Sequence, residues 1–230
     1  MPSVLPFDEL NLLHEKKGKK RSIPIKKWFS EMRLPEQEIK DREEFAEEMK
    51  DDVFRILALL FTILEMNRLE DIYFVKKQLS DSIIALFNNY TYPDSETLGY
   101  IEKYSSDFID TTVSRTKLLF GIDVSDEKLL IPVAYWLSED RATYNAENEA
   151  NTLFNKEQFR QVKADGLLHK QWQTMKDERV RLTHVEVDNT ILPIDVPFTV
   201  GDSLMMYPRD RSLGASADEI INCRCTCRYF

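Results

Sequence analysis

The sequence predicts an α+β protein in three parts. These are an extended, basic N-terminal arm (1–40), a mainly helical body (41–168) and a small β-rich C-terminal lobe (169–230). Prolines punctuate the first part, apolar residues recur every three or four positions through the second, and short alternating segments follow Gly166. With 230 residues, of which 43% are apolar, the chain is long enough to form a sizeable core.

The arm contains four prolines and differs in charge from the rest of the chain. Residues 1–40 carry a net charge of +3, whereas the remainder carries −12. Its apolar side chains suggest that it docks on its own body or on a partner. Its basic residues either contact DNA phosphates or belong to a solvated terminus. They are Lys16, Lys17, Lys19, Lys20, Arg21, Lys26 and Lys27.

The apolar periodicity of the body predicts four helices. We expect them over 41–69, 72–87, 95–121 and 133–164. Asp94 is placed to cap the third, and Pro132 interrupts the chain before the fourth. The middle of the fourth helix, 138–151, is polar all round, which favours a surface for a partner.

After Gly166 the pattern predicts strands over 169–174, 181–187 and 191–194, with a turn at Asp188-Asn189. On a strand, His184, Glu186 and Asp188 share one face. Trp172 is expected to anchor the core of this lobe. The arginines around these segments either bind a phosphate or, as we expect, form ion pairs with aspartates. The arginines are Arg179, Arg181, Arg224 and Arg228, and the aspartates are Asp177, Asp210 and Asp218.

Glycine and cysteine exclude several classes of protein. The 6 glycines are too far apart for any phosphate-binding loop or nucleophile elbow built on paired glycines. The 3 cysteines, Cys223, Cys225 and Cys227, form a poor disulfide framework. We see neither a secretory signal nor an apolar run long enough to span a membrane, so we expect folding in a reducing cytoplasm.

The last sixty residues contain several motifs in a fixed order. The elements are Trp-x-Thr, Asp-x-Arg-x-Arg-x-x-His, Pro-x-Asp and Asn-Cys-Arg-Cys. This string resembles the C-terminal signature of the tailed-phage head-morphogenesis family, the Mu F-type minor head or minor capsid proteins. We expect its residues to be structural parts of the lobe. They are Trp172, Asp177, Arg179, Arg181, His184, Pro208, Asp210, Asn222, Cys223, Arg224 and Cys225.

The sequence departs from the family pattern at several points. Asn189 and Arg209 stand where the pattern has glycine in a turn. Upstream, Glu149 matches the last residue of an Arg-Thr-Glu element, but the Arg and the Thr are absent. Residues 1–130 resemble the family only in being helical and charged.

The resemblance implies a non-enzymatic phage minor head protein that binds the portal or inner capsid during head assembly and DNA packaging. It would act in the host cytoplasm during assembly and reside in the virion, in the head interior or at the portal vertex, without contacting a membrane. Two alternatives stay open: a metal- or nucleotide-dependent effector enzyme that shares the lobe, and a DNA-binding accessory protein that uses the basic arm.

The expectation for metals is that none is bound and that no cofactor is needed. If zinc is bound, the candidate ligands are His184, Cys223 and Cys225. A Cys-x-Cys pair differs from the spacing usual in structural zinc sites, so a hydrogen bond from the histidine is the preferred interpretation.

Overall fold

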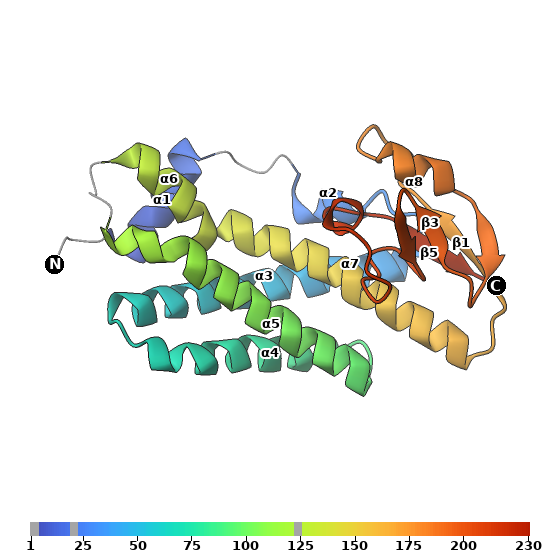
Figure 1. Cartoon of the computed structure of the whole chain (residues 1–230), viewed down its shortest axis with the longest axis horizontal. Coiled ribbons are helices and arrows are strands. Elements are labelled where there is room, and N and C mark those ends of the chain that lie inside the picture. The colour runs from blue at the N-terminus through green and yellow to red at the C-terminus, as the bar shows by residue number, and fades with distance from the viewer. Residues whose placement is uncertain (1–4, 19–22, 122–125) are drawn as a thin grey trace. The chain divides into compact units, whose positions relative to one another are not determined.

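The computed structural model describes residues 5–18, 23–121 and 126–230, which form two compact units (Figure 1). The first unit comprises Met1–Ser22 and Glu47–Ala146, and the second comprises Ile23–Ala46 and Glu147–Phe230. The prediction of an α+β protein, mainly helical with a small sheet near its C-terminus, is confirmed.

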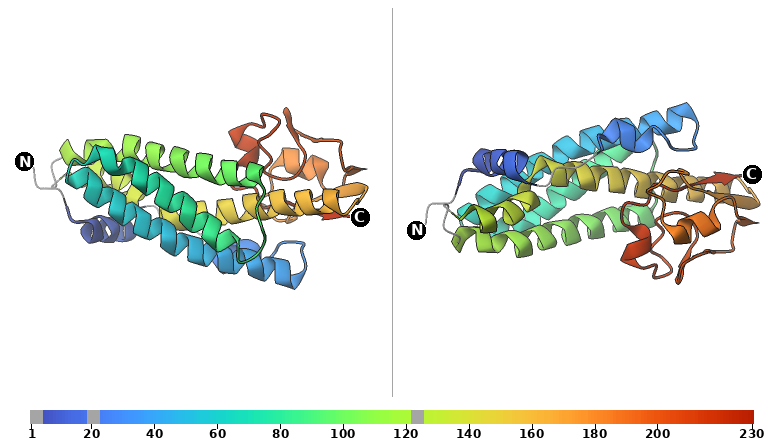
Figure 2. Two further views of the ribbon diagram at one scale, coloured as in Figure 1. Left: turned by 90° about the horizontal axis from the view of Figure 1, so that it is seen from below. Right: turned by 90° about the horizontal axis from the view of Figure 1, so that it is seen from above.

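The first unit is helical throughout its described part. Figures 1 and 2 show α4 and α5 lying side by side, and Lys76 Nζ on α4 donates to Asp110 Oδ2 on α5 at 2.6 Å. The unit also holds parts of the two longest helices. Its elements are α1 (Phe7–Lys17), most of α3 (Glu36–Glu65), α4 (Ile72–Phe87), α5 (Ser95–Thr116), α6 (Glu127–Ala134), the start of α7 (Glu139–Ala164), and the 3-10 turns Leu69–Asp71, Lys117–Gly121 and Tyr135–Leu137.

The predicted helices of the body are confirmed, with shifted ends. The helix expected over 72–87 matches α4 at both ends. Asp94 caps α5 as predicted, because its Oδ1 accepts from the Thr97 backbone N–H at 2.8 Å. The last helix begins later than expected, at Glu139, where the Ser138 hydroxyl accepts from the Arg141 N–H at 3.2 Å and starts a new helix.

The prediction of an extended arm is wrong for three of its segments, one of which is 36–40 at the start of α3. Residues 7–17 form α1, and α2 spans Ile25–Phe29. Pro6 and Pro24 stand directly before these helices, where the missing N–H of proline costs no helical hydrogen bond. Trp28 and Phe29 are buried, as expected of docked apolar side chains.

The second unit contains two small antiparallel sheets. The first has the order β2 (Ile191–Pro193), β1 (His169–Gln173) and β5 (Thr226–Tyr229), and the second pairs β3 (Phe198–Val200) with β4 (Ser203–Met205). The strands expected at 169–174 and 191–194 are therefore confirmed. The unit also contains two short helices, α8 (Leu182–Val187) and α9 (Ala217–Ile220), together with α2, the start of α3 and most of α7.

The core of the lobe gathers around Trp172, which is fully buried as predicted. Its ring meets Phe198 edge-on, with centroids 5.2 Å apart, and meets the His184 ring edge-on at 5.7 Å. Burial of such aromatic rings stabilises a small core strongly. The other members of the cluster are Val187, Val200, Met205, Cys223, Cys225 and Cys227.

Candidate functional site

The segment expected to be a strand over 181–187 is instead the helix α8. Its two buried residues, His184 and Val187, are three positions apart, which is the helical and not the strand spacing. The expected common face of His184, Glu186 and Asp188 is therefore wrong: Glu186 is exposed, and Asp188 accepts from the Thr174 backbone N–H at 2.7 Å. Of the three residues His184, Glu186 and Asp188, only His184 is buried.

An irregular segment that precedes β5 carries Asn222, Cys223 and Cys225. Asn222 has a φ of 58°, a left-handed conformation that asparagine tolerates better than most residues. Its backbone N–H donates to Asn148 Oδ1 at 3.0 Å. The carbonyl oxygens of Cys223 and Cys225 accept from Asn151 Nδ2 at 3.1 and 3.4 Å. Side chains of α7 thus satisfy backbone groups that have no sheet partner.

The polar side chains in the middle of α7 therefore include several that are buried inside the second unit. Asn148, Asn151 and Asn155 recur at helical spacing and are all buried. Asn155 Nδ2 donates to the carbonyl oxygens of Pro208 and Cys225 at 3.2 and 3.1 Å. The expectation that 138–151 faces a partner is wrong for Asn148 and Asn151, because their side-chain amides hold the lobe backbone.

Arg209 is a second internal anchor. Its φ is 73°, so it occupies the left-handed turn for which the family pattern has glycine, and Asn189 does the same with a φ of 63°. The Arg209 guanidinium is buried. Its Nη1 donates to Asn148 Oδ1 at 2.6 Å and to the Ile220 carbonyl at 3.1 Å, and its Nε donates to Thr152 Oγ1 at 2.7 Å.

The remaining residues of the signature make structural contacts. Arg224 pairs with Asp177 as predicted. Asp210 does not pair with an arginine as we expected: it accepts from the Met206 and Ser212 backbone N–H groups, both at 2.8 Å. Around them, the Arg179 N–H donates to Asp177, Arg181 donates to the Ile221 carbonyl, and the Pro208 carbonyl accepts from Asn155.

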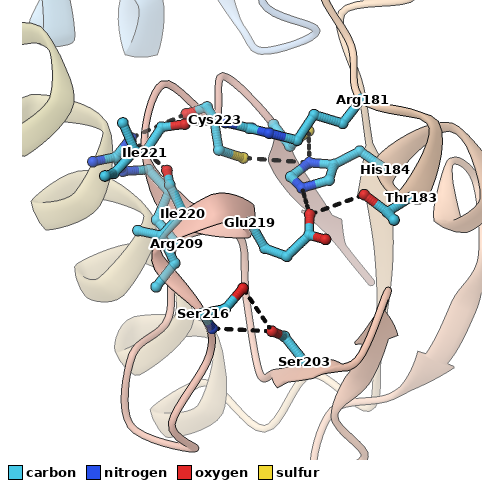
Figure 3. A network of polar contacts seen from close by, with 11 residues as sticks. Arg181, Thr183, His184, Ser203, Arg209, Ser216, Glu219, Ile220, Ile221 and Cys223 are labelled. Carbon is cyan, nitrogen blue, oxygen red and sulfur yellow. Dashed lines mark hydrogen bonds and ion pairs between the residues drawn. The ribbon is translucent and has the colours of Figure 1, made fainter.

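A buried histidine lies against two cysteines and a glutamate (Figure 3). His184 Nδ1 is 3.3 Å from Cys225 Sγ and 3.6 Å from Cys223 Sγ. On the opposite side of the ring, Nε2 is 2.9 Å from Glu219 Oε2, which also accepts from Thr183 Oγ1 at 2.9 Å. The structure therefore brings together the three candidate ligands and adds a carboxylate from α9.

The ionisable groups of this cluster have pKa values that are shifted in different directions. Burial alone would raise the pKa of the Cys223 thiol, but hydrogen bonds from Cys225 and His184 and the nearby Arg209 charge hold it well below its ordinary value. Burial and the neighbouring Cys223 raise the pKa of Cys225. For His184, burial lowers the pKa, but the contacts with Cys223 and Glu219 outweigh burial and leave the pKa raised. The pKa values of the two thiols are therefore shifted in opposite directions.

Lys170 is a buried cation on β1. Its side chain is 0% exposed, and its Nζ donates to the Met206 carbonyl at 2.6 Å. Burial lowers the pKa of Lys170 to about 8. The native protein therefore loses this proton at a lower pH than the unfolded chain, whose lysine has a pKa of about 10.4.

Replacing this lysine, as in Lys170→Met, is expected to change how stability depends on pH. Between pH 8 and about 10.4 the unfolded chain binds more protons at this position than the native protein, so the wild type gains stability as pH rises. Relative to the variant, the gain is up to about 1.4 kcal/mol per pH unit. Urea unfolding at pH 7, 8, 9 and 10 measures this difference. Parallel curves for the two proteins would contradict the prediction.

The basic residues of the arm fall into different parts of the structure. Lys16 and Lys17 end α1, and Lys17 Nζ is 2.5 Å from Glu127 Oε1. Lys26 and Lys27 are exposed on α2. The other three, Lys19, Lys20 and Arg21, lie outside the described residues.

Sequence reasoning missed Glu219 and the role of Arg209. Glu219 stands in a polar segment with no motif around it, so the sequence held no signal for it. The asparagines of α7 did carry a signal, because Asn148, Asn151 and Asn155 lie on one helical face. A row of asparagines on one face of a helix can form hydrogen bonds with an irregular backbone segment of the same chain, and not only with a partner protein.

Comparison with known proteins supports the resemblance. The family model described as Phage Mu protein F like protein matches residues 124–228. Searches of the curated proteins and of the solved structures found no match. Among the described residues, no helix is both long and apolar enough to cross a membrane. Residues 124–228, slightly less than half of this chain, are thus similar to a family of structural phage head proteins.

Proposed function

We propose that this protein is a non-enzymatic minor head protein, which binds the portal or the inner capsid during head assembly and DNA packaging. The observation that carries the proposal is the family match over 124–228, which includes the whole signature. The signature's charged side chains support it. Asp177, Arg224 and Asp210 are engaged in ion pairs or backbone hydrogen bonds that hold the lobe together.

The proposal places the protein in the virion, in the head interior or at the portal vertex, after assembly in the host cytoplasm. Contact with DNA through the basic residues of 16–27 stays a prediction. The exposure of Lys26 and Lys27 is compatible with it, whereas Lys17 already pairs with Glu127. Since the chain as a whole carries a net charge of −9, any such contact would be local.

The test is a phage that lacks this gene and is complemented with a tagged wild-type copy. We expect the tagged protein to copurify with portal rings and to be present in purified particles. Without it, we expect fewer DNA-filled heads by electron microscopy and by quantification of packaged DNA. Normal yields of infectious particles without the gene, or absence of the protein from assembly intermediates and particles, would overturn the proposal.

A pair of surface variants sharpens this test. Tyr73 and Phe74 on α4 are exposed by 67% and 65%. Replacing both with serine is expected to reduce recovery of portal or capsid protein without changing the stability of the purified chain. The matched control is Tyr92→Ser, which removes an aromatic side chain exposed by 86% from the connection between α4 and α5. Equal recovery from all three proteins would direct the search for the contact to another surface.

A further inference from the structure

The cluster of His184, Cys223 and Cys225 has the composition of a metal site. One nitrogen and two sulfurs lie within 4.8 Å of one another, and all three residues are buried. The His184 Nδ1 distances to the two sulfurs are 3.3 and 3.6 Å. Figure 3 shows the Cys223 sulfur and the Glu219 carboxylate on opposite sides of the imidazole.

These distances agree with those between two ligands of one tetrahedral zinc ion. Zinc binds sulfur at about 2.3 Å and imidazole nitrogen at about 2.0–2.1 Å. At tetrahedral angles these bond lengths separate the nitrogen from each sulfur by about 3.6 Å. The two observed nitrogen–sulfur distances therefore lie within a few tenths of an ångström of those in a tetrahedral zinc site.

Glu219 supplies the outer partner that a histidine ligand to zinc usually has. Its carboxylate lies 2.9 Å from His184 Nε2 and accepts its hydrogen bond, so Nε2 keeps its proton when a metal displaces the proton of Nδ1, the nitrogen that faces the two sulfurs. Thr183 Oγ1 and the Glu219 carboxylate are held together at 2.9 Å. Gly201, with a φ of 56°, leaves room for this carboxylate, because a Cβ there would lie 2.7 Å from Glu219 Oε1.

The backbone that carries the two cysteines is held in place independently of any metal. Asn151 and Asn155 donate to the carbonyl oxygens of Cys223 and Cys225. Arg224, between the two cysteines, turns the other way and pairs with Asp177. Both sulfurs thereby point to the same side, and the ligands are arranged before a metal arrives.

We propose that His184 Nδ1, Cys223 Sγ and Cys225 Sγ bind one zinc ion, with Glu219 as the hydrogen-bond partner of His184. These three residues fill three of the four positions of a tetrahedral zinc ion and leave the fourth for a solvent molecule. Thiolate and imidazole ligands favour zinc over magnesium or calcium, which prefer oxygen. The ion ties α8 to the irregular segment before β5.

The short Cys-x-Cys spacing, which favoured a metal-free lobe from sequence alone, does not oppose this assignment. In the usual Cys-x₂₋₄-Cys zinc sites, a turn between the two cysteines brings their sulfurs together. Here the segment is irregular, and the positive φ of Asn222 lets the chain turn immediately before Cys223.

The first experiment uses the full chain, purified without chelators and under reducing conditions. We expect one zinc per chain by inductively coupled plasma mass spectrometry. X-ray absorption should show two sulfur neighbours and one histidine nitrogen around the metal. Replacement by Co²⁺ should produce the visible bands of tetrahedral cobalt and a near-ultraviolet thiolate-to-cobalt band. Stripping with a chelator should lower the melting temperature, and adding Zn²⁺ should restore it.

Matched variants then assign the ligands. Cys223→Ser and Cys225→Ser are each expected to lose stoichiometric zinc, whereas Cys227→Ser, which replaces a cysteine that is equally buried nearby, is expected to keep it. Glu219→Gln should keep one zinc at saturation but bind it about 10–100-fold more weakly, as measured by chelator competition. If the ligand variants fail to fold, the cobalt spectrum and X-ray absorption of the wild type decide the matter.

Three results would overturn the proposal. One is a folded wild-type protein that takes up neither Zn²⁺ nor Co²⁺ when reduced. Another is full zinc occupancy in folded Cys223→Ser and Cys225→Ser proteins. The third is an intact mass, measured on freshly purified protein, that shows a disulfide between Cys223 and Cys225 in place of bound metal.

Discussion

Arg209→Gly is expected to destabilise the lobe by about 3 kcal/mol, although glycine suits this turn better than arginine does. The φ of 73° favours glycine by about 1–2 kcal/mol. Against this, the variant loses the buried hydrogen bonds that the guanidinium donates to Asn148, Thr152 and the Ile220 carbonyl. Each bond from a charged donor contributes about 1.5–3 kcal/mol, and its buried partner would be left unsatisfied.

Asn189→Gly is the matched control. Asn189 has a similar φ of 63°, but its side chain is exposed: its Oδ1 accepts from Arg33 at 3.3 and 3.4 Å, and its Nδ2 donates to the neighbouring Asp188 Oδ2 at 2.7 Å. We expect a change within about 0.5 kcal/mol of zero, because relief of the turn and loss of surface contacts nearly cancel. Arg209→Lys should fall between, since lysine keeps the charge but not the planar fork of donors.

Urea unfolding of the four proteins measures these differences. The order of the four unfolding free energies distinguishes two roles for Arg209. Either it only occupies a turn position that glycine would fill equally well, or its hydrogen bonds stabilise the lobe. An Arg209→Gly protein as stable as the wild type would show that its hydrogen bonds contribute nothing net and that backbone strain dominates at this position.

The helical body could be predicted because its signals are local. The periodic apolar positions and the Asp94 cap place α4 and α5 without any knowledge of the rest of the fold. The prolines of the arm were interpreted too simply. Pro6 and Pro24 begin helices here, and a proline before a helix is locally indistinguishable from one in an extended chain unless the following residues form an apolar stripe.

The lobe could be predicted only in part, since its interactions join residues far apart in sequence. The six residues of α8 alternate in polarity and include β-branched valines, so local propensity favours a strand. Burial of His184 against the cysteine segment, about forty residues later, outweighs that propensity. The motifs identified His184, Cys223 and Cys225 as residues of one cluster. The hydrogen bond to Glu219 and those from the asparagines of α7 could not be predicted, because they depend on tertiary structure.

Trp172→Ala is expected to cost about 3–5 kcal/mol, the range for removing a large aromatic side chain from a core. Trp172 is 0% exposed, and its ring separates the His184 imidazole from Phe198. The cavity would therefore loosen the support of the cysteine cluster as well as the sheet. Trp172→Phe keeps an aromatic ring at the site and should cost about half as much or less.

Amide hydrogen exchange measures which parts of the chain are destabilised by Trp172→Ala. The chain forms two compact units, and Trp172 lies wholly within the second. We expect amides of β1 and β5 to lose protection by a factor of 100 or more, since 1.4 kcal/mol corresponds to a factor of ten. Amides of α4 and α5 in the first unit should keep their protection. An equal loss in both units would mean that the whole chain unfolds as one cooperative body, and that the lobe is not stabilised independently of the helical unit.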